Sequence, residues 1–548
     1  MTAAPGFRKR LGRSAADLAA PVLLLVGPFQ AFLRFHSYGF LQPESLVLTG
    51  IFTIIALLYG LWIMRTRSAA GRALLLTVLL VVAIDFQFPQ VDGHFRLLTL
   101  VLLAATWLLQ AHATVLVTVT ALAFYASNLA LGEHLSVRLE SNPQAVHRTD
   151  LPPLFHFILD EHIGLDGIPP DVPGAAEARV DLTETYLAQG FRIFARAYSP
   201  YHLTTNAVPN LFNFARSDID QGWLGGAPAP IPSTLKQNAY FERLRADGYS
   251  IRVYQPDFID LCASDVVPES CYTIPRNTIM QLPRLGLPWY PRMWFVLAYY
   301  TANHSYLYRR LRQLYEGRIR SMAASRGLDL PPWHWANSRI NAAGAMDLLA
   351  RMRSDIDDLA SIRGTAFVAH LIDPHSPYLV DQDCTPHLDV RQRLEPVDEV
   401  DASSASDRKQ RYRLYLAQAQ CLASQLRDFF REVQRVSGPD AVIVLHGDHG
   451  SRIATVVPES GAVDSMTAAD FGDLYSAFFA VRAPGIAPGI DTTVIATQDL
   501  LRYLVNTGFT SSSVTPDSAP TVFLPSVESG KLVAVPLPPF WHGPLDNR

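Results

Sequence analysis

The stretch Ala441-Val442-Ile443-Val444-Leu445-His446-Gly447-Asp448-His449-Gly450 decides the fold class of this 548-residue chain. Its first five residues are apolar, and the run stops abruptly at polar residues. A short apolar run of this kind is typical of a strand that is buried on both faces of a parallel sheet. The stretch therefore predicts a buried strand with polar side chains at its carboxyl end.

Two other stretches have the same pattern. Leu154-Phe155-His156-Phe157-Ile158-Leu159 ends in Asp160-Glu161, and Thr365-Ala366-Phe367-Val368-Ala369 ends in His370. Helical patterns lie between these strands, and this alternation favours an α/β fold with helices on both faces of a mostly parallel sheet. Ligands of such sheets bind beyond the carboxyl ends of the strands, so we expect the three polar clusters to lie close together.

The first 135 residues have a different composition. They hold four apolar blocks, at about 17–35, 45–64, 73–88 and 97–131. A helix needs about 20 apolar residues to cross the hydrocarbon core of a membrane. The last block is far longer than that, so we divide it into two spans, about 95–109 and 113–131. The sequence thus predicts a five-helix transmembrane anchor over residues 1–135.

The basic residues near the span ends indicate an orientation. Lys and Arg occur in the run 8–13 and in the loop 65–72, whereas the loops 36–44 and 89–94 contain none. Basic loops stay in the cytoplasm. With five spans, everything after about residue 135 is therefore expected outside the cytoplasm, as in a periplasmic domain anchored in a bacterial inner membrane. Asp85, at the outer end of the third span, is expected at the interface or against a headgroup or ligand.

The remaining chain divides into a polar linker, 136–152, and a domain that covers 153–548. One segment of that domain, about 281–345, departs from the α/β pattern, because an aromatic patch is followed by an Arg-rich helical run, 308–320. Such a segment suits the membrane surface or a lipid substrate, and ordinary packing of an inserted helical hairpin is the alternative. The net charge of -4, with 18% charged residues, gives no polybasic signature, so nucleic acid is not an expected partner.

Carboxylates and imidazoles at the strand ends are suited to a divalent cation. Asp160 and Glu161 follow the first strand, and Asp448 and His449 follow the last. A mixed set of carboxylate, hydroxyl and imidazole ligands suits zinc, with manganese as the alternative, because calcium prefers more oxygen ligands. We therefore expect a zinc or manganese site.

A hydroxyl group is predicted near that cation. Thr204 and Thr205 stand where a loop is expected to pass into a helix, and a helix N-terminus favours a bound anion. A hydroxyl placed on a cation loses its proton more easily and becomes a nucleophile. Each motif alone has an ordinary alternative, such as an N-cap or a turn, but four of them in this chain order indicate one site.

Together these segments resemble the alkaline-phosphatase superfamily in its sulfatase-like branch, and in particular its membrane-anchored phosphoethanolamine transferases and lipoteichoic-acid synthases. The resemblance covers the five-helix anchor and about 300 residues of the second part of the chain. It implies an α/β/α sandwich outside the cytoplasm. Its specific part is four short motifs.

The resemblance also implies roles for single residues. It makes Glu161 a metal ligand, with Asp160 either a second ligand or a residue that orients the loop. Thr204, five residues before Pro209, matches the nucleophile, which also binds the metal. Asp448 and His449 match the remaining metal ligands.

The residues expected to bind substrate come from two of the motifs. His370 and His375 match the pair that holds the transferred group, and Asn206, in the Thr204 motif, is a further candidate. Two departures stand out: no Cys brackets the Thr204 loop, and 451–463 contains no His. Because no Cys or Ser lies in the motif that sulfatases need, a true sulfatase is the less favoured interpretation.

The four cysteines, Cys262, Cys271, Cys384 and Cys421, all lie beyond the predicted spans. An even number suits two disulfides in an oxidising compartment, and buried free thiols are the alternative. We expect Cys262 to pair with Cys271 and Cys384 with Cys421, although four cysteines allow three connectivities.

The sequence therefore predicts a phosphotransferase. In this interpretation metal-bound Thr204 attacks the headgroup phosphate of a phospholipid, diacylglycerol leaves, and a glycan or lipid hydroxyl accepts the phospho group. The alternatives are a sulfatase-like hydrolase, which acts as a phosphodiesterase, phosphatase or sulfuric ester hydrolase, and a non-catalytic scaffold.

Overall fold

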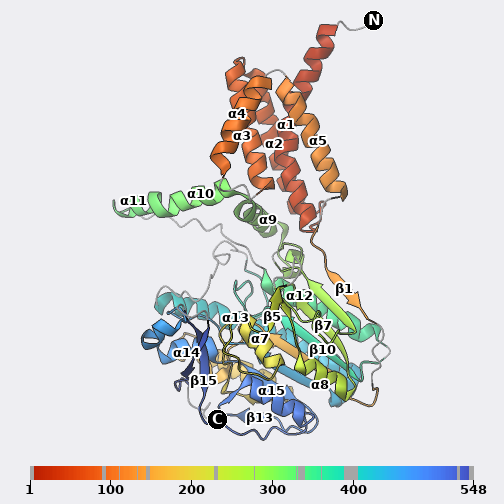
Figure 1. Cartoon of the computed structure of the whole chain (residues 1–548), viewed down its shortest axis with the longest axis vertical. Coiled ribbons are helices and arrows are strands. Elements are labelled where there is room, and N and C mark those ends of the chain that lie inside the picture. Colours follow the sequence, from red (N-terminus) through yellow and green to blue (C-terminus); the bar gives the residue numbers. More distant parts are fainter. Residues whose placement is uncertain are drawn as a thin grey trace. The chain divides into compact units, whose positions relative to one another are not determined.

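The computed structural model describes residues 5–88, 94–109, 112–131, 134–142, 148–226, 233–276, 278–328, 330, 340–359, 361–387, 405–526 and 531–541. The chain divides into two compact units (Figure 1). The first unit comprises Met1–Ser136, Thr278–Ser338 and Leu388–Pro396, and the second comprises Val137–Asn277, Arg339–His387 and Val397–Arg548.

The first unit begins with five helices, α1 (Pro5–Phe35), α2 (Pro43–Arg65), α3 (Ala69–Gln87), α4 (Phe95–Leu109) and α5 (Ala113–Leu131). Among the described residues, four helices are long and apolar enough to cross a membrane, within α1, α2, α3 and α5. The prediction of five spans is wrong by one. Helix α4 has 15 residues and rises only about 22 Å, which is less than the roughly 30 Å of a hydrocarbon core.

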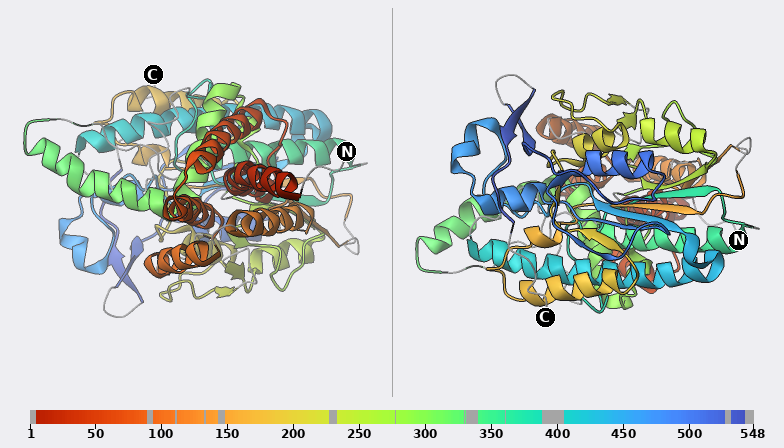
Figure 2. Two further views of the ribbon diagram at one scale, coloured as in Figure 1. Left: turned by 90° about the horizontal axis from the view of Figure 1, so that it is seen from above. Right: turned by 90° about the horizontal axis from the view of Figure 1, so that it is seen from below.

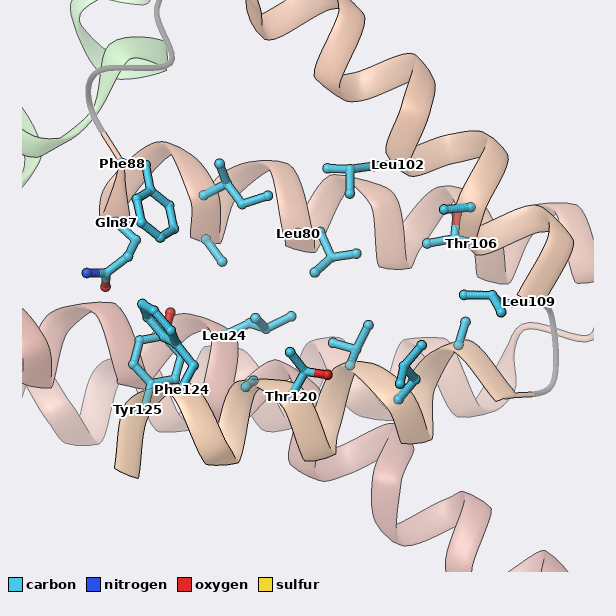
Figure 3. A pocket seen from close by; sticks show the side chains of 17 residues that line it. Leu24, Leu80, Gln87, Phe88, Leu102, Thr106, Leu109, Thr120, Phe124 and Tyr125 are labelled. Atoms are coloured by element: carbon cyan, nitrogen blue, oxygen red, sulfur yellow. The ribbon is translucent and has the colours of Figure 1, made fainter. Parts of the chain in front are cut away.

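Apolar side chains cover the outside of these helices, as a lipid environment requires. Ile54 and Leu58 of α2, for example, are 60% and 62% exposed. Inside the bundle two charged side chains neutralise each other, with Arg72 Nη2 2.6 Å from Asp17 Oδ2. Helices α1, α3, α4 and α5 also surround an apolar pocket of about 400 Å³, lined among others by Leu80 and Phe124 (Figure 3).

A second group of helices belongs to the first unit as well. It comprises η4 (Leu282–Leu285), α9 (Trp289–His304), α10 (Tyr306–Leu314), the π-helical turn η5 (Tyr315–Arg320) and α11 (Ser321–Ala324). Most of the segment 281–345, expected as an insertion in the catalytic domain, therefore packs with the membrane helices. Its polar contacts to the ends of α2 and α3 explain this difference.

The second unit is built on a nine-stranded sheet with the order β1-β9-β7-β10-β2-β11-β12-β3-β13. Its strands are β1 (Arg138–Ser141), β2 (Leu154–Leu159), β3 (Arg192–Phe194), β7 (Ser250–Pro256), β9 (Ser270–Ile274), β10 (Thr365–Leu371), β11 (Val442–Gly447), β12 (Phe479–Arg482) and β13 (Gly489–Asp491). The five central strands, β9 to β11, are parallel, as the sequence predicted. Strand β1 lies inside the segment 136–152 that was expected as a linker, and it pairs with β9.

Helices cover both faces of this sheet, so the predicted α/β/α sandwich is confirmed. One core joins Phe155 and Phe157 of β2 to α6 (Ala175–Leu187), α12 (Asn341–Asp358) and α13 (Ala405–Ser437). The other joins Leu154 and Ile158 to α7 (Thr204–Phe212), α8 (Ala239–Asp247) and α15 (Thr497–Asn506). Figure 2 shows α6 and α13 side by side on one face. Successive residues of a strand point to opposite faces, and β2 is buried on both.

Short elements complete the second unit. They are η3 (Leu165–Gly167), β4 (Ala197–Tyr198), β5 (Leu224–Gly226), β6 (Ser233–Leu235), β8 (Ile259–Asp260), η7 (Gly438–Asp440), η8 (Ser460–Ser465), α14 (Ala468–Tyr475), β14 (Ile495–Ala496), β15 (Thr521–Pro525) and β16 (Leu532–Pro536).

Candidate active site

The sheet brings the predicted polar clusters to one edge. Strand β2 lies between β10 and β11 and pairs in parallel with both. Asp160 and Glu161 follow β2, His370 lies near the end of β10, and Asp448 follows β11 directly. The expected convergence at the carboxyl ends of the strands is therefore confirmed.

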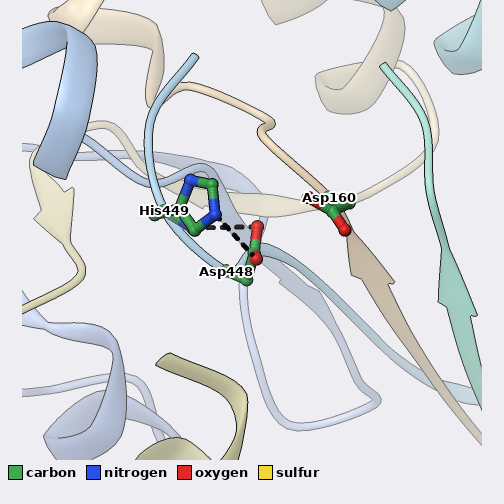
Figure 4. Close-up of side chains that lie close together, drawn as sticks. All are labelled: Asp160, Asp448 and His449. Carbon is green, nitrogen blue, oxygen red and sulfur yellow. Dashed lines mark hydrogen bonds and ion pairs between the residues drawn. The ribbon is translucent and has the colours of Figure 1, made fainter. Parts of the chain in front are cut away.

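Three of these residues form a compact cluster. One ligand atom each of Asp160, Asp448 and His449 lies within 4.8 Å of the others, and all three side chains are buried. The Nε2 atom of His449 is 3.1 Å from Oδ2 of Asp448 (Figure 4). Asp160, Glu161 and His375 form a second group of the same size, so Asp160 belongs to both.

The cluster has the chemistry of a cation site. Among the described residues, the buried Asp160 Oδ1 has no hydrogen-bond partner, and the buried Asp448 Oδ2 has an ion-pair contact with His449 Nε2 but no hydrogen bond. A buried carboxylate oxygen without a hydrogen bond is unfavourable, and a divalent cation removes that penalty. Carboxylate oxygens together with imidazole nitrogens suit zinc and related metals. The residues therefore fit a divalent cation.

The electrostatics of the cluster differ from residue to residue. Burial acts to raise the pKa of Asp448, but the neighbouring His449 and hydrogen bonds from Thr204 and the Glu161 amide outweigh it and lower that pKa. Burial acts to lower the pKa of His449, and Asp448 raises it above its usual value. Burial raises the pKa of Glu161. Asp448 is thus held more firmly in its ionised form than Glu161 is.

Thr204 is the hydroxyl residue beside this cluster. Helix α7 begins at Thr204, so the predicted junction between loop and helix is confirmed. The Thr204 Oγ1 atom lies 3.2 Å from His449 Nε2. Because backbone N–H groups point outward at a helix N-terminus, this position also favours an anion such as a phosphoryl group.

Asn206, expected to contact substrate, has a different set of contacts. Its side-chain amide donates to Asp220 Oδ1 at 2.8 Å, and its Oδ1 accepts from the Gln221 amide at 2.7 Å. Both polar atoms therefore hold the loop at 220–221. The structure does not bring Asn206 into the cluster, because these local partners already use its side chain.

The two histidines expected to hold the transferred group lie against carboxylates. His370 Nε2 is 3.3 Å from Asp160 Oδ2, and His375 Nε2 is 3.3 Å from Glu161 Oε1. His375 therefore has a position that also suits a metal ligand. The substrate-binding role of both residues stays a prediction.

Sequence reasoning missed Arg452. Its Nη1 atom lies 3.7 Å from Glu161 Oε1, and its backbone has a positive φ of 55°. A guanidinium group is suited to charge on phosphoryl oxygens. The available signal was a basic residue in the turn directly after the Asp-His-Gly motif.

Tyr415 of α13 was missed as well. Its hydroxyl donates to the Glu161 carbonyl at 2.7 Å and accepts from the Ile163 amide at 2.8 Å. Glu161 has a left-handed backbone with φ of 65°, which costs a non-glycine residue energy. Tyr415 and the hydrogen bond from the Glu161 amide to Asp448 Oδ1 hold this turn.

The cysteines form the two expected disulfides, Cys262–Cys271 and Cys384–Cys421. The free-thiol alternative is therefore wrong. The second disulfide ties the segment after His375 to α13. Close to it on α13, Gln418 accepts from the Leu379 amide at 2.7 Å and donates to the His375 carbonyl at 3.3 Å.

No protein-family model and no curated protein matches the chain. Among solved structures it is similar to the phosphonate monoester hydrolase of Agrobacterium radiobacter, with 13% identity and a TM-score of 0.38 over 69% of this chain and 82% of that one. It is similar to the candidate sulfatase yidJ from Bacteroides fragilis, with 15% identity and a TM-score of 0.37 over 69% and 78%. It is also similar to the C-terminal periplasmic domain of EcEptC from Escherichia coli in complex with Zn, with 11% identity and a TM-score of 0.37 over 72% and 95%. These structures include the sulfatase-like class that the motifs resemble, but with TM-scores below 0.5 they carry no argument about function.

Proposed function

We propose that the chain is a membrane-anchored, metal-dependent phosphotransferase that works through a covalent intermediate on Thr204. One observation carries the proposal: the Thr204 hydroxyl lies beside His449 in a buried cluster that includes carboxylate oxygens without a hydrogen bond, Asp160 Oδ1 and Asp448 Oδ2. A hydroxyl, a cation site and a helix N-terminus at one point are the parts that phosphoryl transfer needs.

Five residues would hold the metal: Asp160, Glu161, Thr204, Asp448 and His449. His375 is also in reach. We propose zinc, with manganese as the alternative. When bound, the cation supplies positive charge that lowers the pKa of a hydroxyl and attracts phosphoryl oxygens.

The remaining chemistry belongs to the residues of the chain. The Thr204 hydroxyl lies 3.2 Å from His449 Nε2, so this imidazole is within reach of the hydroxyl proton. Arg452 and the first turn of α7 supply positive charge for the phosphoryl oxygens. We assign to His370 and His375, which lie close to the carboxylates, the hydrogen bonds to the transferred group.

The membrane helices favour a lipid donor. In the proposed reaction the Thr204 oxygen bonds to the headgroup phosphorus, and the bond from phosphorus to the diacylglycerol oxygen breaks. That oxygen takes up a proton, and diacylglycerol leaves. A glycan or lipid hydroxyl then attacks phosphorus, loses its proton and frees Thr204. The disulfides support an oxidising compartment, and we propose the periplasmic face of a bacterial inner membrane.

The test is the mass of the peptide that carries Thr204, in protein purified from membranes with its lipids. We expect a phosphoethanolamine or phosphoglycerol adduct that is absent from Thr204→Ala and from Asp448→Asn. Thr205→Ala is the matched control, because it removes the neighbouring hydroxyl and should keep the adduct.

Two other outcomes contradict the proposal in different ways. Unmodified Thr204 together with a stoichiometric metal would favour hydrolysis, with water as the acceptor. Unmodified Thr204 without any bound metal would favour a non-catalytic scaffold.

A further inference from the structure

A continuous helix in the first unit, Tyr306–Ala324, leaves the end of the bundle sideways (Figures 1 and 2). It consists of α10, η5 and α11, and we call it the amphipathic helix. None of the described side chains of α10 and η5 is buried. Large apolar side chains on such a helix need a partner, because contiguous exposed apolar surface is rare in proteins that stand free in water.

The apolar side chains form a row. Leu311, Leu314, Ile319 and Met322 are 57%, 44%, 41% and 49% exposed, and their spacing is three, five and three positions. A regular α-helix keeps one face by steps of three or four, which would place Arg318 in this row. The π-helical turn widens the helix by one residue, so Ile319 takes that place instead. The irregular turn therefore keeps the apolar row continuous.

The rest of the amphipathic helix is strongly basic. Its charged residues are five arginines and one acid, Arg309, Arg310, Arg312, Arg318, Arg320 and Glu316. A helix with an apolar face and an Arg-rich polar face is typical of helices that lie in the surface of a membrane with anionic lipids.

The start of the amphipathic helix is fixed to the end of a membrane span. Asp85, in the last turn of α3, accepts from the backbone amides of Tyr306 at 2.8 Å and Leu307 at 3.2 Å, and Ser305 donates its hydroxyl to the same carboxylate. A carboxylate at the first amides of a helix caps it and is favoured by the helix dipole. The amphipathic helix thus begins where α3 reaches the membrane boundary.

Other contacts define the same boundary. Arg292 of α9 lies 3.2 Å from Glu44 at the start of α2, and the ring of Tyr306 lies 5.5 Å from Phe95 at the start of α4. The chain preceding α9 also contacts the end of α1, where His36 Nδ1 lies 3.1 Å from the Thr278 hydroxyl. Since α1 and α3 end where α2 and α4 begin, all these contacts are on one side of the bundle.

We propose that the amphipathic helix lies in the membrane surface, with its apolar row at the boundary of the acyl chains and its arginines on anionic phospholipid headgroups. The row, the arginines and the anchoring at Asp85 support this partner together. The inference does not depend on the reaction that the second unit performs.

The full chain, reconstituted into phosphatidylcholine vesicles with or without phosphatidylglycerol, tests the proposal. The described cysteines are all paired, so a thiol-reactive fluorophore labels introduced cysteines selectively. Leu314→Cys and Ile319→Cys report on the row, and Gln313→Cys and Arg318→Cys report on the polar face. Quenching is measured with nitroxide-labelled acyl chains and with aqueous iodide.

We expect labels at 314 and 319 to be quenched several-fold more by the lipid nitroxide than labels at 313 and 318, and iodide to give the reverse order. Lipid quenching at 318 but not 319 would overturn the role of the π-helical turn. Equal iodide quenching at all four positions would overturn the membrane-surface location. Protection of 314 and 319 from both quenchers would overturn it too, because the row would then pack on protein.

The headgroup part of the proposal has its own test. A triple variant replaces three arginines by glutamine: Arg309→Gln, Arg310→Gln and Arg312→Gln. In vesicles with phosphatidylglycerol at low salt, it should show less lipid quenching at position 314, because contacts to anionic headgroups are lost. The matched control, Arg65→Gln with Arg67→Gln at the other end of the spans, should leave that quenching unchanged. Equal quenching in the two kinds of vesicle would overturn the preference for anionic lipid.

Discussion

Two buried carboxylates in the second unit, Asp448 and Asp473, have opposite surroundings. Arg408 donates to both oxygens of Asp473, at 2.7 and 2.9 Å, and the Tyr412 hydroxyl donates to one of them. Asp448 lies beside Asp160, and its Oδ2 has an ion-pair contact with the His449 imidazole at 3.1 Å instead of an arginine. The first carboxylate is neutralised by the protein itself, whereas the second is arranged for a cation.

The two carboxylates also have different effects on the surrounding chain. The Asp473 carbonyl accepts from the Arg452 amide at 2.8 Å, so the ion pair with Arg408 supports the loop that follows His449. Asp448 instead fixes the turn at Glu161 through the Glu161 amide. This comparison predicts that substitutions in the site around Asp448 abolish turnover. It predicts that substitutions that break the Asp473 ion pair lower the stability of the fold.

The largest expected effect is on turnover. Thr204→Ala should reduce the release of diacylglycerol from a phospholipid donor by about a thousandfold or more, because a nucleophile is lost. The melting temperature should stay close to that of the parent. Thr204→Ser keeps a hydroxyl and should retain measurable turnover. Full turnover by Thr204→Ala would contradict the role of Thr204 as the nucleophile, and with it the functional role of the site around Asp448.

The second effect is on stability. Arg408→Met leaves Asp473 as a buried charge without its partner, which typically costs about 3–5 kcal/mol. Thermal or denaturant unfolding of the detergent-solubilised chain should show this loss. Arg408→Met combined with Asp473→Leu removes both charges and should restore most of the stability. A stable single variant would show that the Asp473 pair is not structural.

The third prediction concerns the cation. Zinc at about 100 times its dissociation constant should stabilise the second unit by about 2.7 kcal/mol, because it binds only the folded state. Asp448→Asn should abolish this shift. Without metal, Asp448→Asn should be less stable than the parent at neutral pH, because the fold lowers the pKa of Asp448 and so favours its ionised form. A zinc shift that survives in Asp448→Asn would place the metal elsewhere.

A smaller effect, the pH dependence of stability, comes from a buried histidine and not from either of these carboxylates. His156, fully buried in β2, accepts from or donates to the Tyr240 hydroxyl at 2.9 Å. Burial, with a further contribution from His446, lowers the pKa of His156 well below its usual value of 6.5. The unfolded chain therefore binds more protons below pH 6.5, and stability should fall as pH falls, by at most about 1.4 kcal/mol per pH unit for this residue.

Unfolding measured between pH 7 and pH 4.5 checks that slope. His156→Gln should reduce it, and His134→Gln, at an exposed position of the first unit, should not. An unchanged slope in His156→Gln would show that other groups carry the pH dependence.

The parts of the site that sequence predicted are those fixed by the sheet. Asp160, His370 and Asp448 converge because parallel strands end at one edge of the sheet. In the sequence, each such strand is recognised as an apolar run followed by a polar residue. The expected junction between loop and helix pointed to Thr204 and Thr205, and the resemblance, with Thr204 five residues before Pro209, singled out Thr204.

The missed parts depend on contacts between distant segments. Tyr415 reaches Glu161 from the middle of α13, and nothing in the pattern of a helix shows which of its buried tyrosines supports a turn elsewhere. The short α4 was counted as a span because apolar composition continues past it, although the helix ends at Leu109. Strand β1 was taken for a linker because its residues are mostly exposed and polar, as an edge strand allows.

The order of the strands has a consequence for the synthesis of the protein. The central strand β2 ends at Leu159, but its two neighbours, β10 and β11, begin only at Thr365 and Val442. Between them the ribosome makes the whole segment 278–338, which belongs to the first unit. Closure of the sheet must therefore wait until that segment has been made, and both backbone edges of β2 lack β10 and β11 during this time. A nascent chain that stops before Thr365 should be a target for chaperones and proteases, however well its membrane helices have inserted.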